Sequence, residues 1–529
     1  MADLFSSMRV VDKDDATPPE PTPPASGRSA AKPSASGRGR TASSIASTVK
    51  SIQDIMRKDA GVDGDAQRIS QLAWMLFLKL LDDKEQEYEL LDDAYRSPLP
   101  DRLKWRAWAA DDEGITGDAL AGFVDARLLP VLRGESVKTD DGTDLRLDLS
   151  LPAGQLIRGV FEDTYNYMKS GTLLRQVANK LGEIDFTTTH DRHAFNDVYE
   201  TILKGLQSAG NAGEYYTPRA VTRFMAERVD PRLGDVVFDP ACGTGGFLVD
   251  AIEHLRRKGI NSVLERDVLQ STIRGVEKKP LPHLLATTNL ILHDIEVPQV
   301  EHGNSLARPL RDYGPKDRVD VVLTNPPFGG VEEDGIENNF PVEFRTRETA
   351  DLFMALILRR LKEGGRAAVV LPDGFLFGEG VKTRLKETLL AECDLHTVVR
   401  LPNGVFAPYT SINTNLLFFE KGRPTKATWF VEHPLPEGYR QYTKTKPVRF
   451  EEFGYLADWW TDRKETEWAW KASVDDLVER GFNLDLENPH EEEAERHDPV
   501  ELLAELEAAQ AEVQATRDAL RAALAEALA

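Results

Sequence analysis

The sequence is poor in the features that mark several large classes of protein. Its 529 residues include only two cysteines, Cys242 and Cys393, so no disulfide framework is indicated and a reducing cytoplasm is the expected location. No apolar run approaches the roughly 18 residues of a membrane-spanning helix, and the N-terminus shows no apolar signal region. A membrane role is therefore not expected.

Two chemical signatures are also missing. The two cysteines and ten histidines do not occur at ligand spacings, so no metal site is predicted. No G-x-x-x-x-G-K-[ST] phosphate loop occurs, which excludes a P-loop DNA motor.

Positive charge is in short supply. The chain holds 65 lysines and arginines against 88 aspartates and glutamates, a formal net charge of −23. Affinity for duplex DNA depends mostly on basic side chains that neutralise phosphates, so this chain by itself is not expected to bind DNA tightly. If DNA is the substrate, a basic partner is implied; acidity that only maintains solubility is the alternative.

The ends of the chain differ in composition from its middle. Residues 1–43 are rich in Pro, Ser, Gly and Ala, which predicts a disordered tail. In residues 44–180 apolar positions recur at spacings of three and four, which predicts an α-helical domain used for docking or packing. Residues 490–529 carry a leucine pattern compatible with a heptad seam. This pattern predicts a C-terminal helix that pairs with a partner helix or folds back onto its own domain.

Residues 181–489 are the predicted catalytic domain, and within it strands and helices alternate between about residues 198 and 432. The predicted strands are Asp235–Asp239, Thr272–Glu277, Val319–Thr324, Arg366–Leu371, Leu395–Leu401 and Thr414–Glu420. Such alternation predicts an α/β fold with a mostly parallel, doubly wound, Rossmann-like sheet. A further strand, Ala427–Glu432, is expected to form a terminal hairpin with Thr414–Glu420 and to add an antiparallel edge.

A glycine-rich turn follows the first of these strands. The run from Asp239 to Gly246 departs from the G-x-G-x-x-G dinucleotide fingerprint, so a different adenosyl cofactor fits better. Gly243, Gly245 and Gly246 allow close backbone approach, and Asp239 supplies negative potential for a ligand with an ammonium and a sulfonium. At the end of the next strand, Glu277 lies where the ribose hydroxyls of a nucleoside would bind.

Two weaker signals flank this turn. Thr217 and Pro218 are placed as the N-cap and first residue of a helix, whose free amides could take a carboxylate; an ordinary cap is the alternative. Asn304 follows a later segment and could touch the adenine of the cofactor, although an Asx turn explains it equally well.

The tetrapeptide Asn325-Pro326-Pro327-Phe328 directly follows a predicted buried strand. An exocyclic amine is a poor nucleophile because its lone pair is delocalised into the ring. The Asn325 amide oxygen and the Pro326 carbonyl can each accept one of its N–H groups and so turn the lone pair toward a methyl donor. The prolines stiffen the backbone, and Phe328 offers a face on which a flipped base can stack. These residues predict methyl transfer to an exocyclic amine.

Along the chain the motifs occur in the order Glu214–Arg219, Asp239–Phe247, Glu277 and Asn325–Phe328. This set closely resembles the DNA adenine-N6 methyltransferases, and specifically the modification subunit of type I restriction-modification systems. The resemblance covers roughly residues 44–489 and includes the phrase Gly481–Pro489 near the end of the methyltransferase region. It implies that S-adenosylmethionine is the methyl donor. The predicted cofactor-binding residues are Glu214, Tyr215, Tyr216, Thr217, Pro218, Arg219, Asp239, Gly243, Thr244, Gly245, Gly246, Glu277 and Asn304, and the predicted catalytic residues are Asn325, Pro326, Pro327 and Phe328.

The resemblance also implies partners. Modification subunits of this family usually work as a pair with a separate specificity subunit that reads the DNA, and a restriction subunit with ATPase and nuclease domains can join them. Asn304 departs from the family, since an aspartate is common at that position, and residues 1–40 have no reliable counterpart. Two other functions are the competing interpretations: methylation of a protein glutamine, and a scaffold or regulatory subunit that has lost turnover.

Overall fold

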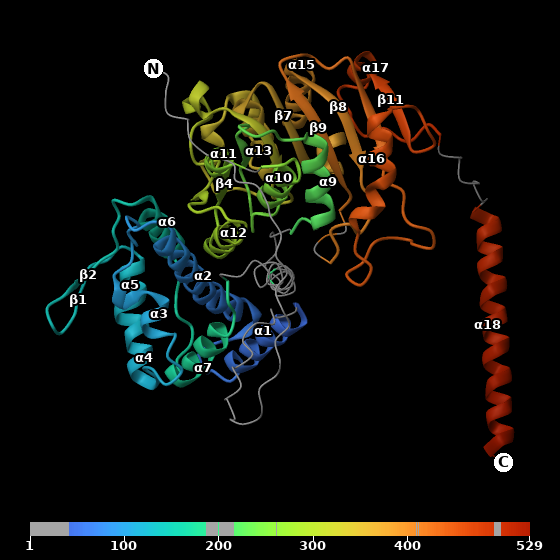
Figure 1. Ribbon diagram of the computed structural model, residues 1–529. Helices are drawn as coiled ribbons and strands as arrows, with labels where there is room; N and C mark the ends of the chain where they lie inside the picture. Colours follow the sequence, from blue (N-terminus) through green and yellow to red (C-terminus); the bar gives the residue numbers. More distant parts are fainter. Residues whose placement is uncertain are drawn as a thin grey trace, which may run out of the picture. The chain divides into compact units, whose positions relative to one another are not determined.

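The computed structural model describes residues 42–186, 199, 216–260, 262–408, 410, 412–490 and 499–528. The predicted tail lies outside the described residues except at its last two positions, which belong to the first helix (Figure 1). Two predicted cofactor-binding residues, Glu214 and Tyr215, also lie outside them.

The N-terminal part of the chain is built mainly of helices. They are α1 (Ala42–Met56), α2 (Gly64–Leu91), α3 (Trp105–Trp108), α4 (Gly117–Phe123), α5 (Leu129–Leu132), α6 (Pro152–Phe161) and α7 (Gly171–Gly182). A small antiparallel hairpin of β1 (Val137–Lys138) and β2 (Asp144–Leu145) interrupts them, which the sequence pattern did not predict.

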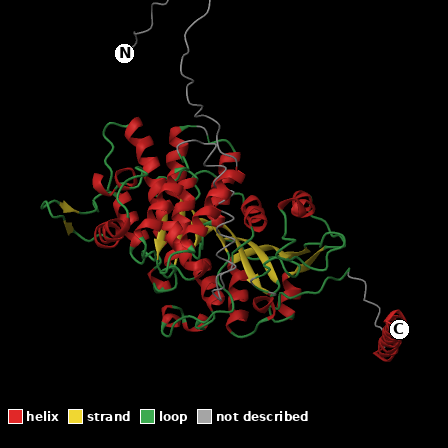
Figure 2. Cartoon of the chain, turned by 90° about the horizontal axis from the view of Figure 1, so that it is seen from below, coloured by secondary structure: helices red, strands yellow, loops and turns green. Residues whose placement is uncertain are grey.

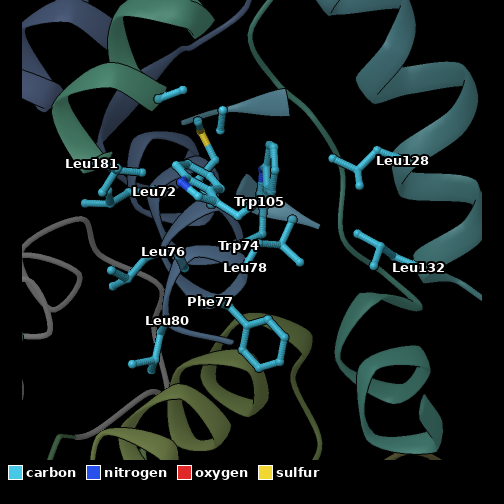
Figure 3. Close-up of a cluster of buried hydrophobic side chains, with 14 of the residues drawn as sticks. Leu72, Trp74, Leu76, Phe77, Leu78, Leu80, Trp105, Leu128, Leu132 and Leu181 are labelled. Carbon is cyan, nitrogen blue, oxygen red and sulfur yellow. The ribbon is translucent and has the colours of Figure 1, made fainter. Parts of the chain in front are cut away.

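Helix α2 is the centre of this helical part. Every residue from Gln71 to Leu80 is buried, and Figure 3 shows its leucines, Trp74 and Phe77 inside the apolar cluster. A helix that is buried on all sides has to be enclosed by other elements. The same cluster includes residues of α12 (Pro280–Leu292), from the sheet-containing part, and Lys84 on α2 donates to Asp294 just beyond α12, at 2.9 Å. The helical part is therefore packed directly on α12.

The rest of the chain forms a nine-stranded sheet with helices between its strands (Figures 1 and 2). The strands are β3 (Val237–Asp239), β4 (Ile273–Glu277), β5 (Gln299–His302), β6 (Val319–Thr324), β7 (Leu361–Pro372), β8 (Cys393–Arg400), β9 (Thr414–Lys421), β10 (Ala427–Glu432) and β11 (Ala469–Ser473). The helices are α9 (Arg219–Val229), α10 (Gly246–Arg257), α11 (Val263–Thr272), α12, α13 (Thr349–Arg360), α14 (Asp373–Phe377), α15 (Val381–Glu392), α16 (Gly454–Thr461) and α17 (Val474–Glu479).

The strand order is β11-β10-β8-β9-β7-β6-β3-β4-β5. All neighbouring pairs from β7 through β6, β3 and β4 to β5 are parallel. Side chains alternate between two apolar cores along these strands: Val321 and Leu323 pack with α9 and α10, while Val319 and Val322 pack with α13 and α15. The prediction of a mostly parallel, doubly wound sheet is confirmed.

The predicted terminal hairpin is wrong. β9 does not pair with β10 but lies between β7 and β8, antiparallel to both, so that Asn415 faces Leu371 on one side and Arg400 on the other. Both faces of β9 are buried almost throughout, so this strand is suited to the sheet interior rather than to an edge. The antiparallel edge is supplied instead by β11, which pairs with β10.

A long helix, α18 (Pro499–Leu528), follows the sheet-containing part and agrees with the predicted C-terminal helix. The apolar residues Leu503, Leu506, Val513 and Leu520 on it are more than half exposed. Its partner helix therefore stays a prediction.

Candidate active site

The carboxyl ends of β3, β4 and β5 are joined by a set of hydrogen bonds to backbone carbonyls. The Cys242 amide donates to the Val276 carbonyl at 3.0 Å, and the Gly303 amide donates to the Glu277 carbonyl at 2.9 Å. Ser305 Oγ donates to the Pro240 carbonyl at 2.6 Å. These contacts hold the glycine-rich turn and the strand ends beside it as one rigid edge.

Glycine is required at two positions of the turn because the backbone there is left-handed. Gly243 has φ of +54° and Gly245, which precedes the first residue of α10, has φ of +81°. A side chain in this region is strained. The turn is also held from α12, where Asn289 Nδ2 donates to the Thr244 carbonyl at 3.0 Å. Asn289 was not among the predicted residues, and nothing in its local sequence marks it.

Asp239 is the most strongly perturbed acid of the site. Its side chain is buried, one oxygen accepts the Ala241 amide at 3.0 Å, and Oδ2 has no hydrogen-bond partner among the described residues. Burial raises the pKa of Asp239 to about 7, and the charge of Glu277 adds to the rise, whereas the Thr324 hydroxyl and the Ala241 amide oppose it. A buried carboxyl in this state favours a cationic ligand.

Glu277 connects the turn to the end of β4. Its Oε2 accepts the Gly243 amide at 2.9 Å, and its Oε1 accepts the Lys279 amide at 2.8 Å. Each carboxylate oxygen has a second lone pair, so the group can still accept from hydroxyl donors. The two contacts fix the direction of the carboxylate.

Asn304 forms the Asx turn that the sequence offered as an alternative. Its Oδ1 accepts the Leu306 amide at 2.9 Å, and its Nδ2 donates to Glu332 Oε2 at 3.2 Å. Glu332 follows the Asn325-Pro326-Pro327-Phe328 motif by four residues and also accepts from Lys278 at 3.3 Å. The loop after the motif is thus fastened to the ends of β4 and β5. Sequence reasoning missed Glu332, and the only signal that could have found it is its position four residues after the motif.

The segment before α9 differs from its prediction in one respect. The helix begins at Arg219 with Pro218 as its N-cap, and no side chain caps it, so Thr217 is not the cap residue. The Arg219 Nη1 donates to the Gly246 carbonyl at 2.8 Å, which ties α9 to the first turn of α10. Tyr216 is partly buried and packs against the apolar cluster of the helical part.

Asn325 lies directly after β6 and is held by Thr217. Its Nδ2 donates to Thr217 Oγ1 at 3.0 Å, a contact between residues 108 positions apart. Its Oδ1 is buried and has no hydrogen-bond partner among the described residues. The amide therefore presents an unused acceptor.

The other residues of the motif differ in exposure. Pro326 is buried and Pro327 is partly buried. Phe328 is only 3% exposed and belongs to the apolar cluster beneath β6. A base could stack on the Phe328 ring only after the groups that cover it have moved.

Two general features of the described residues bear on the site. No helix in these ranges has the length and apolarity to cross a bilayer, and no group of three His, Cys, Asp or Glu side chains there is arranged to hold a metal ion. Cys242 and Cys393 are both buried free thiols.

Comparison with known proteins gives consistent matches. The N-6 DNA Methylase family model matches residues 190–498, and the HsdM N-terminal domain model matches residues 45–181. The EcoEI methylase subunit of the type I restriction enzyme of Escherichia coli is 57% identical over 494 residues, which cover 92% of this chain and 99% of that protein. The EcoKI methylase subunit of Escherichia coli strain K12 is 31% identical over 379 residues, 69% of this chain and 65% of that protein.

Solved structures agree with these relatives. A modification subunit from Vibrio vulnificus YJ016 is 44% identical, with a TM-score of 0.77, and the match covers 88% of this chain and 100% of that one. A chain from a structure of the type I restriction-modification system is 36% identical, with a TM-score of 0.74, over 91% of this chain and 98% of that one.

The fold, the glycine turn and the motif after β6 define a methyltransferase with a Rossmann-like sheet. The chain belongs to the N-6 DNA methylase family and, within it, to the methylase subunits of type I restriction enzymes. It is therefore an adenine-N6-specific DNA methyltransferase of a type I restriction-modification system. The competing assignment to protein glutamine is set aside, and membership of the family implies S-adenosylmethionine as the methyl donor.

Proposed function

We propose that Asn325 and the Pro326 carbonyl hold the exocyclic amine of a flipped adenine for methyl transfer. The observation that carries the proposal is the state of the Asn325 amide. Its Nδ2 is occupied by Thr217, whereas its Oδ1 is a buried acceptor without a partner among the described residues. A buried acceptor left unpaired costs about 1–3 kcal/mol. An N–H of the target amine would donate to Oδ1, remove this cost and take its direction from that hydrogen bond.

The chemistry follows from the acceptor pair. With both N–H groups of the amine directed to the Asn325 and Pro326 oxygens, the nitrogen lone pair points away from them and out of conjugation with the ring. No strong base is needed, because the amine becomes acidic once it has been methylated, and its proton can leave by way of either oxygen or water. The base has to leave the duplex to reach these groups.

The residues at the ends of β3, β4 and β5 fit S-adenosylmethionine, which supplies an electrophilic methyl group on a sulfonium when bound. Two observations support the fit. The turn has glycine at its left-handed positions 243 and 245, so its backbone is bare of side chains there. Asp239 offers a buried carboxyl oxygen that has no hydrogen-bond partner among the described residues. Glu277 would accept from the ribose hydroxyls, and Asn304 would approach the adenine.

The partner assignments rest on the family and on charge. With a net charge of −23, this chain needs a separate specificity subunit to place its catalytic site on DNA. The helical part, residues 44–180, and the C-terminal segment, residues 490–529, are the proposed docking elements, around a catalytic domain of residues 181–489. A second copy of the modification subunit and a restriction subunit complete the proposed assembly, which works in the cytoplasm.

The test is tritiated methyl transfer from S-adenosylmethionine to unmethylated, amplified genomic DNA. The full chain is assayed alone and with the specificity subunit encoded beside it, and the product nucleoside is identified. N6-methyladenine that forms only with the second subunit agrees with the proposal.

The catalytic assignment is tested with two variants of that complex. Asn325→Ala should reduce methyl transfer by a factor of about 100 or more, on the scale of losing a positioned hydrogen-bonding group in an active site, while the complex still assembles. Asn338→Ala changes an exposed asparagine of the loop beyond the motif and is the matched control, with activity near that of the wild type. Full activity of Asn325→Ala would refute the assignment, and a wild-type complex without turnover would favour the scaffold interpretation.

A further inference from the structure

We propose that Thr217 is a positioning residue whose hydroxyl sets which end of the Asn325 amide faces the target amine. The proposal rests on the proposed role of Asn325. It assigns to Thr217 a task on the acceptor side of the site, in place of an N-cap or a purely cofactor-binding role. The contact that carries it is the 3.0 Å hydrogen bond from Asn325 Nδ2 to Thr217 Oγ1.

The reason for such a residue lies in the symmetry of the asparagine side chain. The amide oxygen and the amide nitrogen have nearly the same size and shape, so a half-turn about the last torsion exchanges them at little steric cost. One orientation presents an acceptor to the amine, and the other presents N–H donors that repel its N–H groups. Catalysis requires the first orientation, and the Asn325 side chain alone does not select it.

The structure holds the Asn325 amide in the productive orientation. Among the described residues, Thr217 Oγ1 is the one hydrogen-bond partner of the Asn325 amide, and it takes the nitrogen end. The oxygen end is left for the substrate. The Thr217 hydroxyl is available for this contact because α9 begins after Pro218 and uses no side-chain cap.

A hydroxyl can donate as well as accept, so its own proton matters. No described residue accepts a hydrogen bond from the Thr217 hydroxyl. An anionic group bound at the amino end of α9, such as the carboxylate of the methyl donor, would take that proton. Thr217 could then act toward Asn325 only as an acceptor, and the productive orientation would be firmest when the methyl donor is bound.

The backbone around Thr217 is held firmly enough for this task. The Val221 and Thr222 amides donate to the Pro218 carbonyl at 2.9 and 3.1 Å. Arg219 donates to the Gly246 carbonyl at 2.8 Å, so the start of α9 is tied to the helix that follows the glycine turn. Thr217 therefore keeps a fixed place relative to both the cofactor turn and the end of β6.

The experiment compares Thr217→Val with Thr217→Ser in the complex of the full chain with its specificity subunit. Valine keeps the shape but cannot accept a hydrogen bond, whereas serine keeps the hydroxyl. The single-turnover rate of methyl transfer at saturating S-adenosylmethionine should fall by about tenfold for valine, on the scale of one net hydrogen bond. Serine should restore the rate to within about threefold of wild type. The Kd for S-adenosylmethionine should rise with valine, which cannot donate to the carboxylate of the methyl donor, and should stay near that of the wild type with serine.

A double-mutant cycle separates the proposed contact from other roles of Thr217. Asn325→Ala has no amide group to contact Thr217, so Thr217→Val should lower its residual rate by less than about twofold. An equal loss in both backgrounds would overturn the proposal, as would a loss that appears only as a raised Kd for S-adenosylmethionine. An unchanged rate for Thr217→Val would overturn it as well.

The folding of the variants and the proposed role of Asn325 are checked separately. Thr388→Val, at a partly exposed position of α15, is the control for the exchange itself, and thermal melting reports whether each variant folds. Thr217→Ala provides the same comparison should the valine variant not fold. If Asn325→Ala retains full activity, the proposed function fails; if Asn325→Ala is inactive and Thr217→Val is not impaired, only the inference about Thr217 fails.

Discussion

The raised pKa of Asp239 predicts that cofactor affinity depends on pH. The carboxyl is buried, and its pKa of about 7 means that roughly half of the ligand-free molecules carry a protonated Asp239 at neutral pH. S-adenosylmethionine brings positive charge to the site and so favours the carboxylate. Binding should therefore lower the pKa of Asp239 and release a proton.

The direction and size of the effect follow from linkage. Below about pH 7 the proton has to be removed before binding, so affinity should rise with pH and level off above the pKa. Between about pH 6 and about pH 7 the apparent Kd should fall by about fivefold, within a range where the ammonium of the cofactor stays charged. The same raised pKa means that the folded chain holds this proton more tightly than the unfolded chain. The ligand-free protein should therefore lose stability as pH rises from about 4 to about 7.

The assay is titration calorimetry of S-adenosylmethionine binding to the full chain in buffers of different ionisation enthalpy. The heat should reveal a released proton in wild type near pH 6. Asp239→Asn keeps the shape of the side chain but cannot titrate, so it should bind more weakly with a flat pH profile. A flat profile in the wild-type protein, with no proton released, would refute the idea that Asp239 ionises on binding.

Two further predictions concern the turn and the helical core. Gly245→Ala places a side chain at φ of +81°, which should cost about 1 kcal/mol of stability and lower the affinity for S-adenosylmethionine. The control Gly438→Ala, at φ of +79° in another loop, should lose stability but keep its affinity. Equal affinity for S-adenosylmethionine in both variants would contradict the role of the turn. Phe77→Ala removes a ring that is fully buried and in edge contact with Phe161, their centroids 5.7 Å apart. Urea unfolding should show that Phe77→Ala lowers the free energy of unfolding by about 3–5 kcal/mol. The control Leu91→Ala, at an exposed position of the same helix, should lower it by about 0.5 kcal/mol or less. Similar losses in the two variants would show that Phe77 is not part of the core.

The features that could be read from the sequence are those that depend on neighbouring residues. The apolar run Val319–Thr324 is β6 to the residue, and the motif after it stands at a strand end because prolines cannot continue a strand interior. The glycines at positions 243 and 245 are needed where the backbone is left-handed. The order of these motifs along the chain was enough to recognise the family, because its members share the motifs.

Other features were decided by contacts between distant segments. The β9 strand looked like one arm of a hairpin, yet it is buried between β7 and β8, because an interior strand with two apolar faces gains more from two neighbours than from an edge. Thr217 was expected to cap a helix, yet its hydroxyl contacts Asn325, 108 residues further along. Local patterns determine which elements form and what chemistry they carry, but which side chain reaches which depends on packing across the whole sheet.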